Sequence, residues 1–515
     1  MRPAVGTLRA TLLAAGSLTC PAAAQCGLDT LAGDAFSQNF GAAVALDAER
    51  LVVGDDLADA LTHDAGAAFI FRREGDAWVL EAKLVAHDGQ PGDYFGRAMA
   101  LDGDGLVIGA SWDDGQRGSA YVARRVGTSW TLEAKLVGSD SVAGDHFGNS
   151  VALDGDLAVI GARDSDAQGF GSGSAYVFRR TASGWVQEAM LIRDDGAPDQ
   201  AFGTSVALDD RTAVVGAPGD DEFGEAAGAA YVYEGSGGVW VGTIKLRAPS
   251  AKPFDAFGAS VSIDADLVAA GAPSVTYPGQ AHLFRRVGGN WSAEANLASA
   301  GSLVSNDEFG RPVSVHGERV LVGEGQGGFA IGSGAAHLFE RVGGAWLLGA
   351  RYTAPVPLVL TGFGRVSALH GDVVAVGQPA SGTASLHAAT TALPAWVFLG
   401  DGLAGDLGTP CLVGAGTLAA GDPVTVTLSG AQPDSLAILV FGLSTVHDLF
   451  EGGVLVPSPD TFVKNLPTGP AGSIEIAATT PGLPAGLTFY LQYWIADTTA
   501  PLGLSASNAI SGTVP

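Results

Sequence analysis

The stretch that decides the fold is HFGNSVALDGDLAVIGA (146–162), followed by GSAYVFRR (173–180) and WVQEAML (185–191). The first part holds two short apolar runs around Asp154-Gly155, and Asp-Gly is a favoured pair for a two-residue hairpin turn. The other two parts are rich in β-branched and aromatic residues and are separated by a few polar ones, which predicts a second hairpin. Four antiparallel strands in succession are typical of one blade of a β-propeller.

The same pattern recurs along the chain, and each copy is marked by a Phe-Gly pair. The pairs begin 52 to 55 residues apart, at Phe40, Phe95, Phe147, Phe202, Phe257, Phe309 and Phe363. A repeat of this size cannot bury its own apolar faces and must stack on its neighbours. Because seven copies can close a ring, the sequence predicts a seven-bladed β-propeller.

Residue size along each copy supports radial stacking. The first two strands are rich in small residues, the third carries Tyr or Phe, and the fourth begins with Trp. These Trp residues are Trp78, Trp130, Trp185, Trp240, Trp291 and Trp346. Blades crowd at the axis and splay apart outward, so we expect the Trp side chains to pack between blades. Exposed platforms for sugar stacking are the alternative interpretation.

Composition divides the chain into three parts. Residues 1–24 have the features of a secretory signal, with Arg2 and Arg9, a short apolar run and an Ala-x-Ala cleavage site before Gln25. The repeats occupy residues 25–392. Residues 393–515 lack the repeat and show short alternating strands between Gly and Pro turns, which predicts a small β-sandwich. The predicted fold is therefore all-β, a propeller followed by a sandwich.

Charge, hydropathy and cysteine content exclude some function classes and indicate where in or outside the cell the protein works. The formal net charge is −27, which argues against nucleic-acid binding because that needs a basic face. After the signal, no stretch is apolar enough to span a bilayer, so we expect a secreted or cell-surface protein. Cys26 and Cys411 remain after cleavage and could form a disulfide. The ring could close with residues 26–31, with residues 396–399, or with both.

The pattern FGxSVALDGDxxVIGA, continued by GSAYVFRR, resembles the FG-GAP repeat. That repeat builds the seven-bladed propeller of integrin alpha subunits and of many bacterial surface proteins, and the resemblance covers about residues 28–390. The calcium-binding form of the repeat has a longer acidic loop between its first two strands, whereas this chain has only LDGD at 101–104 and 153–156. The C-terminal part, with GTPCLVGAGTL at 408–418, resembles an uncharacterised module of secreted planctomycete-type proteins.

Acidic residues gather in the loops that a propeller places on its ligand-binding face. They are Asp55, Asp56, Asp59, Asp64, Asp88, Asp93, Asp113, Asp114, Asp140, Asp145, Asp164, Asp166, Asp194, Asp195, Asp199, Asp220, Asp221 and Glu222. Three interpretations stay open: turn chemistry and solubility, divalent cation binding, and recognition of a basic or polar partner. The candidate calcium ligands are Asp164, Asp166, Asp220, Asp221 and Glu222.

No catalytic motif stands out. The sequence lacks HExxH and GxSxG, and the glycines at 323–328 match GxGxxG without a following helix. The sequence therefore favours an exported, non-enzymatic binding or adhesion protein with a protein or glycan partner. The alternatives are a structural envelope component and an extracellular enzyme acting on polysaccharide. The enzyme would be recognised by an Asp or Glu with a raised pKa in a concave central cleft.

Overall fold

The structure is a computed structural model. It describes residues 27–515 except 76, 194, 275, 277, 300–307, 326–333, 355–361, 390–395, 401–409, 416, 417, 419, 422, 451, 452, 481–486, 498–503, 508, 514 and 515. The chain forms two compact bodies. We call Leu28–Leu347 with Val359–His387 the propeller body, and Met1–Gly27 with Leu348–Leu358 and Ala388–Pro515 the second body.

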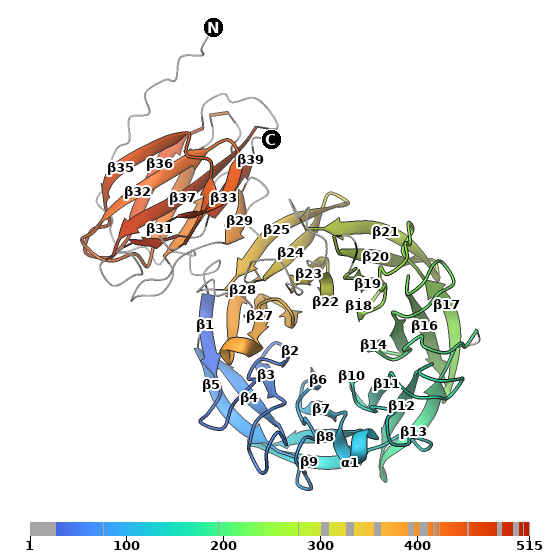
Figure 1. Cartoon of the computed structure of the whole chain (residues 1–515). Helices are drawn as coiled ribbons and strands as arrows, with labels where there is room; N and C mark the ends of the chain where they lie inside the picture. Colours follow the sequence, from blue (N-terminus) through green and yellow to red (C-terminus); the bar gives the residue numbers. More distant parts are fainter. Residues whose placement is uncertain are drawn as a thin grey trace. The chain divides into compact units, whose positions relative to one another are not determined.

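Four-stranded antiparallel sheets follow one another around the propeller body (Figure 1). We call each sheet a blade and number it along the chain. The first blade is β2 (Ala43–Leu46), β3 (Arg50–Asp55), β4 (Ala67–Glu74) and β5 (Ala77–Leu84). The second is β6 (Ala98–Asp102), β7 (Gly105–Ala110), β8 (Ser119–Val126) and β9 (Ser129–Leu136). The third is β10 (Ser150–Asp154), β11 (Leu157–Ala162), β12 (Ser174–Thr181) and β13 (Gly184–Leu191).

The next blades repeat this order. The fourth is β14 (Ser205–Asp209), β15 (Thr212–Ala217), β16 (Ala229–Ser236) and β17 (Val239–Leu246). The fifth is β18 (Ser260–Asp264), β19 (Leu267–Ala272), β20 (Gln280–Val287) and β21 (Asn290–Ala298). The strands β22 (Phe309–His316), β23 (Arg319–Glu324), β24 (Ala335–Val342) and β25 (Ala345–Thr353) pair in the same sequence.

The last blade joins the two ends of the repeat region. It is ordered β1-β28-β27-β26, from β1 (Gly27–Ala32), β28 (Thr383–Ala388), β27 (Val373–Gln378) and β26 (Ser367–His370). The chain therefore closes the ring with its N-terminal strand, which is the first of the predicted alternatives. The all-β propeller prediction is confirmed.

The Phe-Gly pairs act at the contacts between blades. Each Phe, such as Phe202, has no exposed surface, and each packs against aromatic side chains of the third strand. Gly203 has φ +89°, and a Cβ there would lie 2.3 Å from the carbonyl oxygen of Ser174. Only glycine tolerates both conditions, which explains why the pair recurs. The residue before the pair is left-handed in several copies, for example at Tyr94 with φ 57° and His146 with φ 53°.

The fourth-strand Trp side chains pack between blades, as expected from the wedge shape. Trp130 is buried in a cluster with Phe95 of the connection before it and Leu84 of the preceding blade. Its indole N–H donates to Glu81 Oε2 at 3.2 Å, also on the preceding blade. The Trp130 indole thus stabilises the contact between two blades, and a ligand cannot reach it.

The second body is also built of strands. One set pairs in the order β29 (Trp396–Gly400), β39 (Ala509–Thr513), β37 (Thr488–Ala496), β32 (Leu436–Gly442) and β35 (Thr461–Pro467), with β38 (Leu504–Ala506) beside β37. Two further sets are β30 (Cys411–Ala415), β31 (Pro423–Ser429) and β36 (Ile474–Thr479), and β33 (Thr445–Phe450) with β34 (Gly453–Pro457). The all-β prediction for this part is confirmed.

Several predictions concern residues for which the structure gives no answer. The signal at 1–24 and Cys26 lie outside the described residues, so the pairing of Cys26 with Cys411 stays a prediction. The domain boundary at 392–393 likewise stays a prediction. In the described part of the chain, no helix has the length and apolar character needed to cross a membrane.

Candidate functional site

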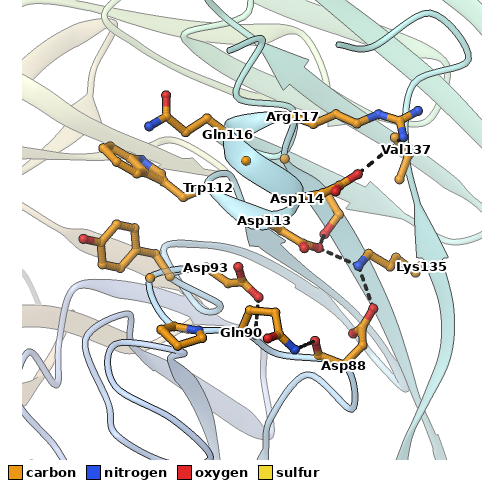
Figure 2. Close-up of a pocket in the computed structure, with 16 residues that line it drawn as sticks. Asp88, Gln90, Asp93, Trp112, Asp113, Asp114, Gln116, Arg117, Lys135 and Val137 are labelled. Carbon is orange, nitrogen blue, oxygen red and sulfur yellow. Dashed lines mark hydrogen bonds and ion pairs between the residues drawn. The ribbon is translucent and has the colours of Figure 1, made fainter. Parts of the chain in front are cut away.

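A pocket of about 620 Å³ lies between two loops of the propeller body (Figure 2). One loop connects β5 of the first blade to β6 of the second, and the other joins β7 to β8 within the second blade. The pocket is lined by Asp88, Gln90, Pro91, Gly92, Asp93, Tyr94, Trp112, Asp113, Asp114, Gly115, Gln116, Arg117, Gly118, Ser119, Lys135 and Val137. Its size lies within the range of small-molecule sites in proteins.

Local turn chemistry shapes both loops. The β7–β8 loop contains the short turn α1 (Asp113–Gln116), in which Asp114 and Gly115 have φ angles of 51° and 68°. In the β5–β6 connection, the Asp93 carboxylate accepts the backbone N–H of Gln90 at 2.6 Å and closes a turn. The left-handed Tyr94 follows directly and places its ring beside the pocket. The pocket is thus formed by backbone turns that the sequence fixes locally.

Trp112 is the aromatic side chain that most distinguishes this pocket. It is 40% exposed, whereas the Trp residues of the fourth strands are buried or partly buried. The indole lies 5.3 Å from the Tyr94 ring at 76° and 5.5 Å from the His146 ring at 56°, measured between centroids. Edge-to-face contacts of this kind hold an aromatic ring in one orientation. The Trp112 indole is therefore exposed to solvent and held in a fixed orientation by its neighbours.

A partly buried ion-pair network forms the floor of the pocket. Lys135 Nζ lies 2.6 Å from Asp113 Oδ2 and 2.7 Å from Asp88 Oδ2 (Figure 2). The Tyr121 hydroxyl also donates to Asp88, at 2.7 Å. Burial opposes the charged form of Lys135, but its hydrogen bonds to Asp113 and Asp88 outweigh burial and raise its pKa. Burial likewise opposes the charge on Asp88, whose pKa is nevertheless lowered by Lys135 and Tyr121. Lys135 and Asp88 therefore stay charged at neutral pH.

Asp93 lines the same pocket without such a cation. Burial raises the pKa of its carboxyl, and the charges of Asp113 and Asp88 add to the rise, although the Gln90 N–H and the charge of Lys135 work in the opposite direction. Asp145 and Asp255 stand at the same place before later Phe-Gly pairs and accept N–H groups in the same way, at 2.8 Å each. Burial raises the pKa of both of these carboxyls as well. The raised pKa of Asp93 is therefore a property of the repeated turn.

Comparison with known proteins identifies the repeat. Three consecutive stretches, residues 78–123, 130–178 and 185–233, match the family described as "FG-GAP repeat". The chain carries FG-GAP repeats. This confirms the resemblance drawn from the Phe-Gly pattern, and the repeats imply a propeller-type binding fold. The pocket loops belong to the first matched stretch and Lys135 to the second.

Similar solved structures have low sequence identity. Sqt1 of Saccharomyces cerevisiae is 11% identical with a TM-score of 0.42, covering 72% of this chain and 100% of its own. A putative 6-phosphogluconolactonase from Bacteroides uniformis is 10% identical with a TM-score of 0.42, covering 64% of this chain and 89% of its own. No curated protein matches the chain in sequence.

The predicted calcium ligands lie in two FG-GAP loops and do not line the pocket. In the β11–β12 loop, Asp164 contacts His146 Nδ1 at 2.8 Å, and Asp166 accepts the Gly171 N–H at 2.8 Å. In the β15–β16 loop, Asp221 accepts the Ala226 N–H at 2.7 Å.

The other two candidates belong to a network like that of the pocket floor. Asp220 accepts the Tyr231 hydroxyl at 2.7 Å and pairs with Lys245 at 2.9 Å, and Glu222 pairs with Lys245 at 2.6 Å. The oxygens of all five candidates thus accept hydrogen bonds or contact cations, and calcium binding by them stays a prediction.

A different group of ligand-type side chains comes together in the first blade. Among the residues that the structure describes, Asp59, His63 and Asp64 are the group of three whose ligand atoms lie within 4.8 Å of one another. Asp59 accepts the Asp64 N–H at 2.9 Å, and His63 Nδ1 lies 2.9 Å from Asp64. The sequence analysis did not single out His63, although its place between two acids in one loop was visible.

The loops are less uniformly acidic at their surface than the sequence predicts. Six of the gathered carboxylates are buried, namely Asp55, Asp56, Asp93, Asp113, Asp145 and Asp220. Asp55, for example, accepts the backbone N–H of Asn39 at 2.8 Å. Many acids of the FG-GAP loops therefore organise turns and ion pairs. The sequence could not separate these from Asp114, which lines the pocket and is exposed.

Proposed function

We propose that this protein is an exported, non-enzymatic binding protein whose propeller loops hold a protein or glycan partner outside the cell. The observation that carries the proposal is the pocket at Trp112, where an exposed indole stands above a rigid, charged floor. Loops on a stiff scaffold are common places for recognition, because the scaffold positions their side chains before the partner arrives.

The chemistry of the pocket favours binding over catalysis. An enzyme acting on polysaccharide needs a protonated acid beside a second free carboxylate. Asp93 has a raised pKa, but Asp145 and Asp255 share it in turns that do not line the pocket. The carboxylates of Asp88 and Asp113 are held by Lys135. Among the residues that line the pocket, these observations therefore point to no pair of carboxyl groups that could serve as catalytic acid and base.

The test uses residues 25–515 immobilised on a surface, with a glycan array and extracellular proteins as probes. We expect a bound probe whose signal falls in Trp112→Ala and is retained in Phe170→Ala. Phe170 is the matched control because it is 75% exposed in the next blade and does not line the pocket. A probe bound equally by both variants would show that the binding site does not include Trp112. Hydrolysis of a polysaccharide that is lost in Asp93→Asn would replace the proposal with the enzyme alternative.

Export has its own test. The full chain, expressed with its first 24 residues, is expected outside the cytoplasm with Gln25 as its first residue by mass spectrometry. An uncleaved product retained inside the cell would contradict export and would leave the binding assay unaffected.

A further inference from the structure

We propose that the pocket at Trp112 binds a quaternary ammonium group, that is, an organic cation with no N–H to donate. The inference rests on the proposed function and names the ligand class of the same site. Aromatic faces attract weakly hydrated cations of this kind, and the attraction grows when the cation is removed from water. Three observations support it: the charge of the pocket, the state of its hydrogen-bond acceptors, and the surroundings of Trp112.

The pocket carries an excess of negative charge. Four carboxylates line it, at Asp88, Asp93, Asp113 and Asp114, against the two cations Lys135 and Arg117, which leaves a formal charge of −2. Half of this excess belongs to Asp93, which forms no ion pair in the described part of the chain, and half to Asp88 and Asp113, which share the single cation Lys135. The whole chain adds to this field with a net charge of −27. A cation is therefore attracted, and an anion is repelled.

Three of the four pocket carboxylates already accept hydrogen bonds, and the exposed fourth, Asp114, lies 3.6 Å from Arg117. Asp88 and Asp113 each accept from Lys135, at 2.7 and 2.6 Å, and Asp93 accepts the Gln90 N–H at 2.6 Å. A primary amine or a guanidinium has several N–H groups that need acceptors once they leave water. It would compete with these internal bonds, whereas a quaternary ammonium requires none. The pocket thus combines negative potential with few free acceptors, which favours the quaternary cation.

Two exposed aromatic rings elsewhere in these loops have cations of their own, and beside the pocket the guanidinium of Arg97 lies 5.8 Å from the centre of the Tyr94 ring. The guanidinium of Arg247 lies 3.9 Å from the centre of the Phe223 ring, and Lys83 Nζ lies 5.8 Å from that of Phe36. Among the described residues, no Lys or Arg lies over Trp112 in this way. Trp is also the best acceptor for such a contact. The same kind of loop surface therefore presents an indole with no internal cation.

The experiment is isothermal titration of choline into residues 25–515 at low salt. The control ligand is 3,3-dimethylbutan-1-ol, which has the shape of choline with carbon in place of the charged nitrogen. We expect choline to bind, the neutral isostere to bind at least about tenfold more weakly, and the same loss of choline affinity in Trp112→Ala. Phe170→Ala is expected to bind as the wild type does.

Two further variants separate the contributions. Asp93→Asn keeps an oxygen that can accept the Gln90 N–H but removes the charge, so it should weaken choline binding without unfolding the turn. Trp112→Phe keeps a weaker aromatic face and should fall between the wild type and Trp112→Ala. Circular dichroism of each variant confirms that it is folded. Unchanged affinity in either Asp93→Asn or Trp112→Ala would overturn the inference.

Three further ligands test where the quaternary ammonium group comes from and whether another class of ligand binds instead. Phosphocholine should bind more weakly than choline because its phosphate meets the negative pocket, and tighter phosphocholine binding would contradict the charge argument. Ethanolamine bound as tightly as choline would show an N–H-accepting amine site and overturn the quaternary class. A neutral oligosaccharide lost in Trp112→Ala, with no choline binding, would also overturn it and would leave the proposed binding function standing.

Discussion

Replacing the Asp113–Lys135 ion pair tests whether the pocket floor is held by charge. The two side chains are 2.6 Å apart and 7% and 29% exposed. The next blade carries Ser165 and Met190 in their places. Met190 and Lys135 both pair in register with a third-strand Tyr, and the carbonyls of Ser165 and Asp113 accept the N–H of equivalent glycines. The chain itself thus supplies an uncharged replacement for the pair.

The magnitude follows from the burial of the pair. Breaking a fully buried ion pair costs about 3–5 kcal/mol, because the remaining charge loses its partner. Lys135 is partly exposed, so water recovers part of this, and Lys135→Met should cost about 2 kcal/mol. Asp113→Ser should cost a similar amount. The double variant removes both charges and should cost about 1 kcal/mol, which is a coupling of about 3 kcal/mol.

The assay is urea denaturation followed by Trp fluorescence at pH 7, with calorimetry to separate the transitions of the two bodies. The double variant should unfold at a higher urea concentration than either single variant. Single-variant effects that add in the double variant would show that the two charges do not stabilise each other. An unchanged free energy of unfolding in Lys135→Met would refute the reasoning.

Four other predictions follow from the fold and its titrating groups. Phe202→Ala should destabilise the propeller body by about 3–5 kcal/mol, measured by urea denaturation, because the ring is fully buried. Gly203→Ala should cost about 3 kcal/mol or more through backbone overlap and its φ of +89°, whereas Gly237→Ala, with φ +58° and open space, should cost about 1 kcal/mol. Burial lowers the pKa of His282 to about 4 from 6.5, so the unfolded state binds the proton first and this residue should lower stability between pH 6.5 and 4 by up to about 3 kcal/mol; His282→Phe should remove this share of the slope, whereas buried His387, whose pKa is also lowered to about 4, keeps its own. Adding calcium or a chelator tests the five predicted calcium ligands: because they already accept hydrogen bonds or contact cations, we expect an unchanged melting temperature, whereas a calcium-dependent rise would support the predicted calcium site.

The sequence predicts the fold well because its signals are local and repeated. The expected hairpin forms, but its two turn residues lie one position later than predicted, at Gly155 and Asp156, because Asp154 pairs with Leu157 as the last residue of its strand. Each Phe-Gly pair also marks one blade contact, where the glycine allows close backbone approach. Seven copies of the same local information leave few arrangements other than a ring.

The pocket could not be predicted because it depends on two loops from different blades. Trp112 follows β7 and Tyr94 precedes β6, and nothing in either segment shows that their rings meet. The roles of the individual acidic residues could not be predicted from the sequence either. Asp93 closes a turn and Asp113 pairs with Lys135, but both are Asp residues in a loop rich in Asp. Residue type predicted an acidic face, whereas burial and partners decide which charges reach the surface.

The most direct test of the account is a crystal structure of residues 25–515 soaked with choline. The account predicts density for the ligand in the pocket, with its nitrogen within about 6 Å of the centre of the Trp112 ring and on the side of Asp93. Choline bound elsewhere on the chain, or an empty pocket in crystals whose Trp112 is free of lattice contacts, would contradict it.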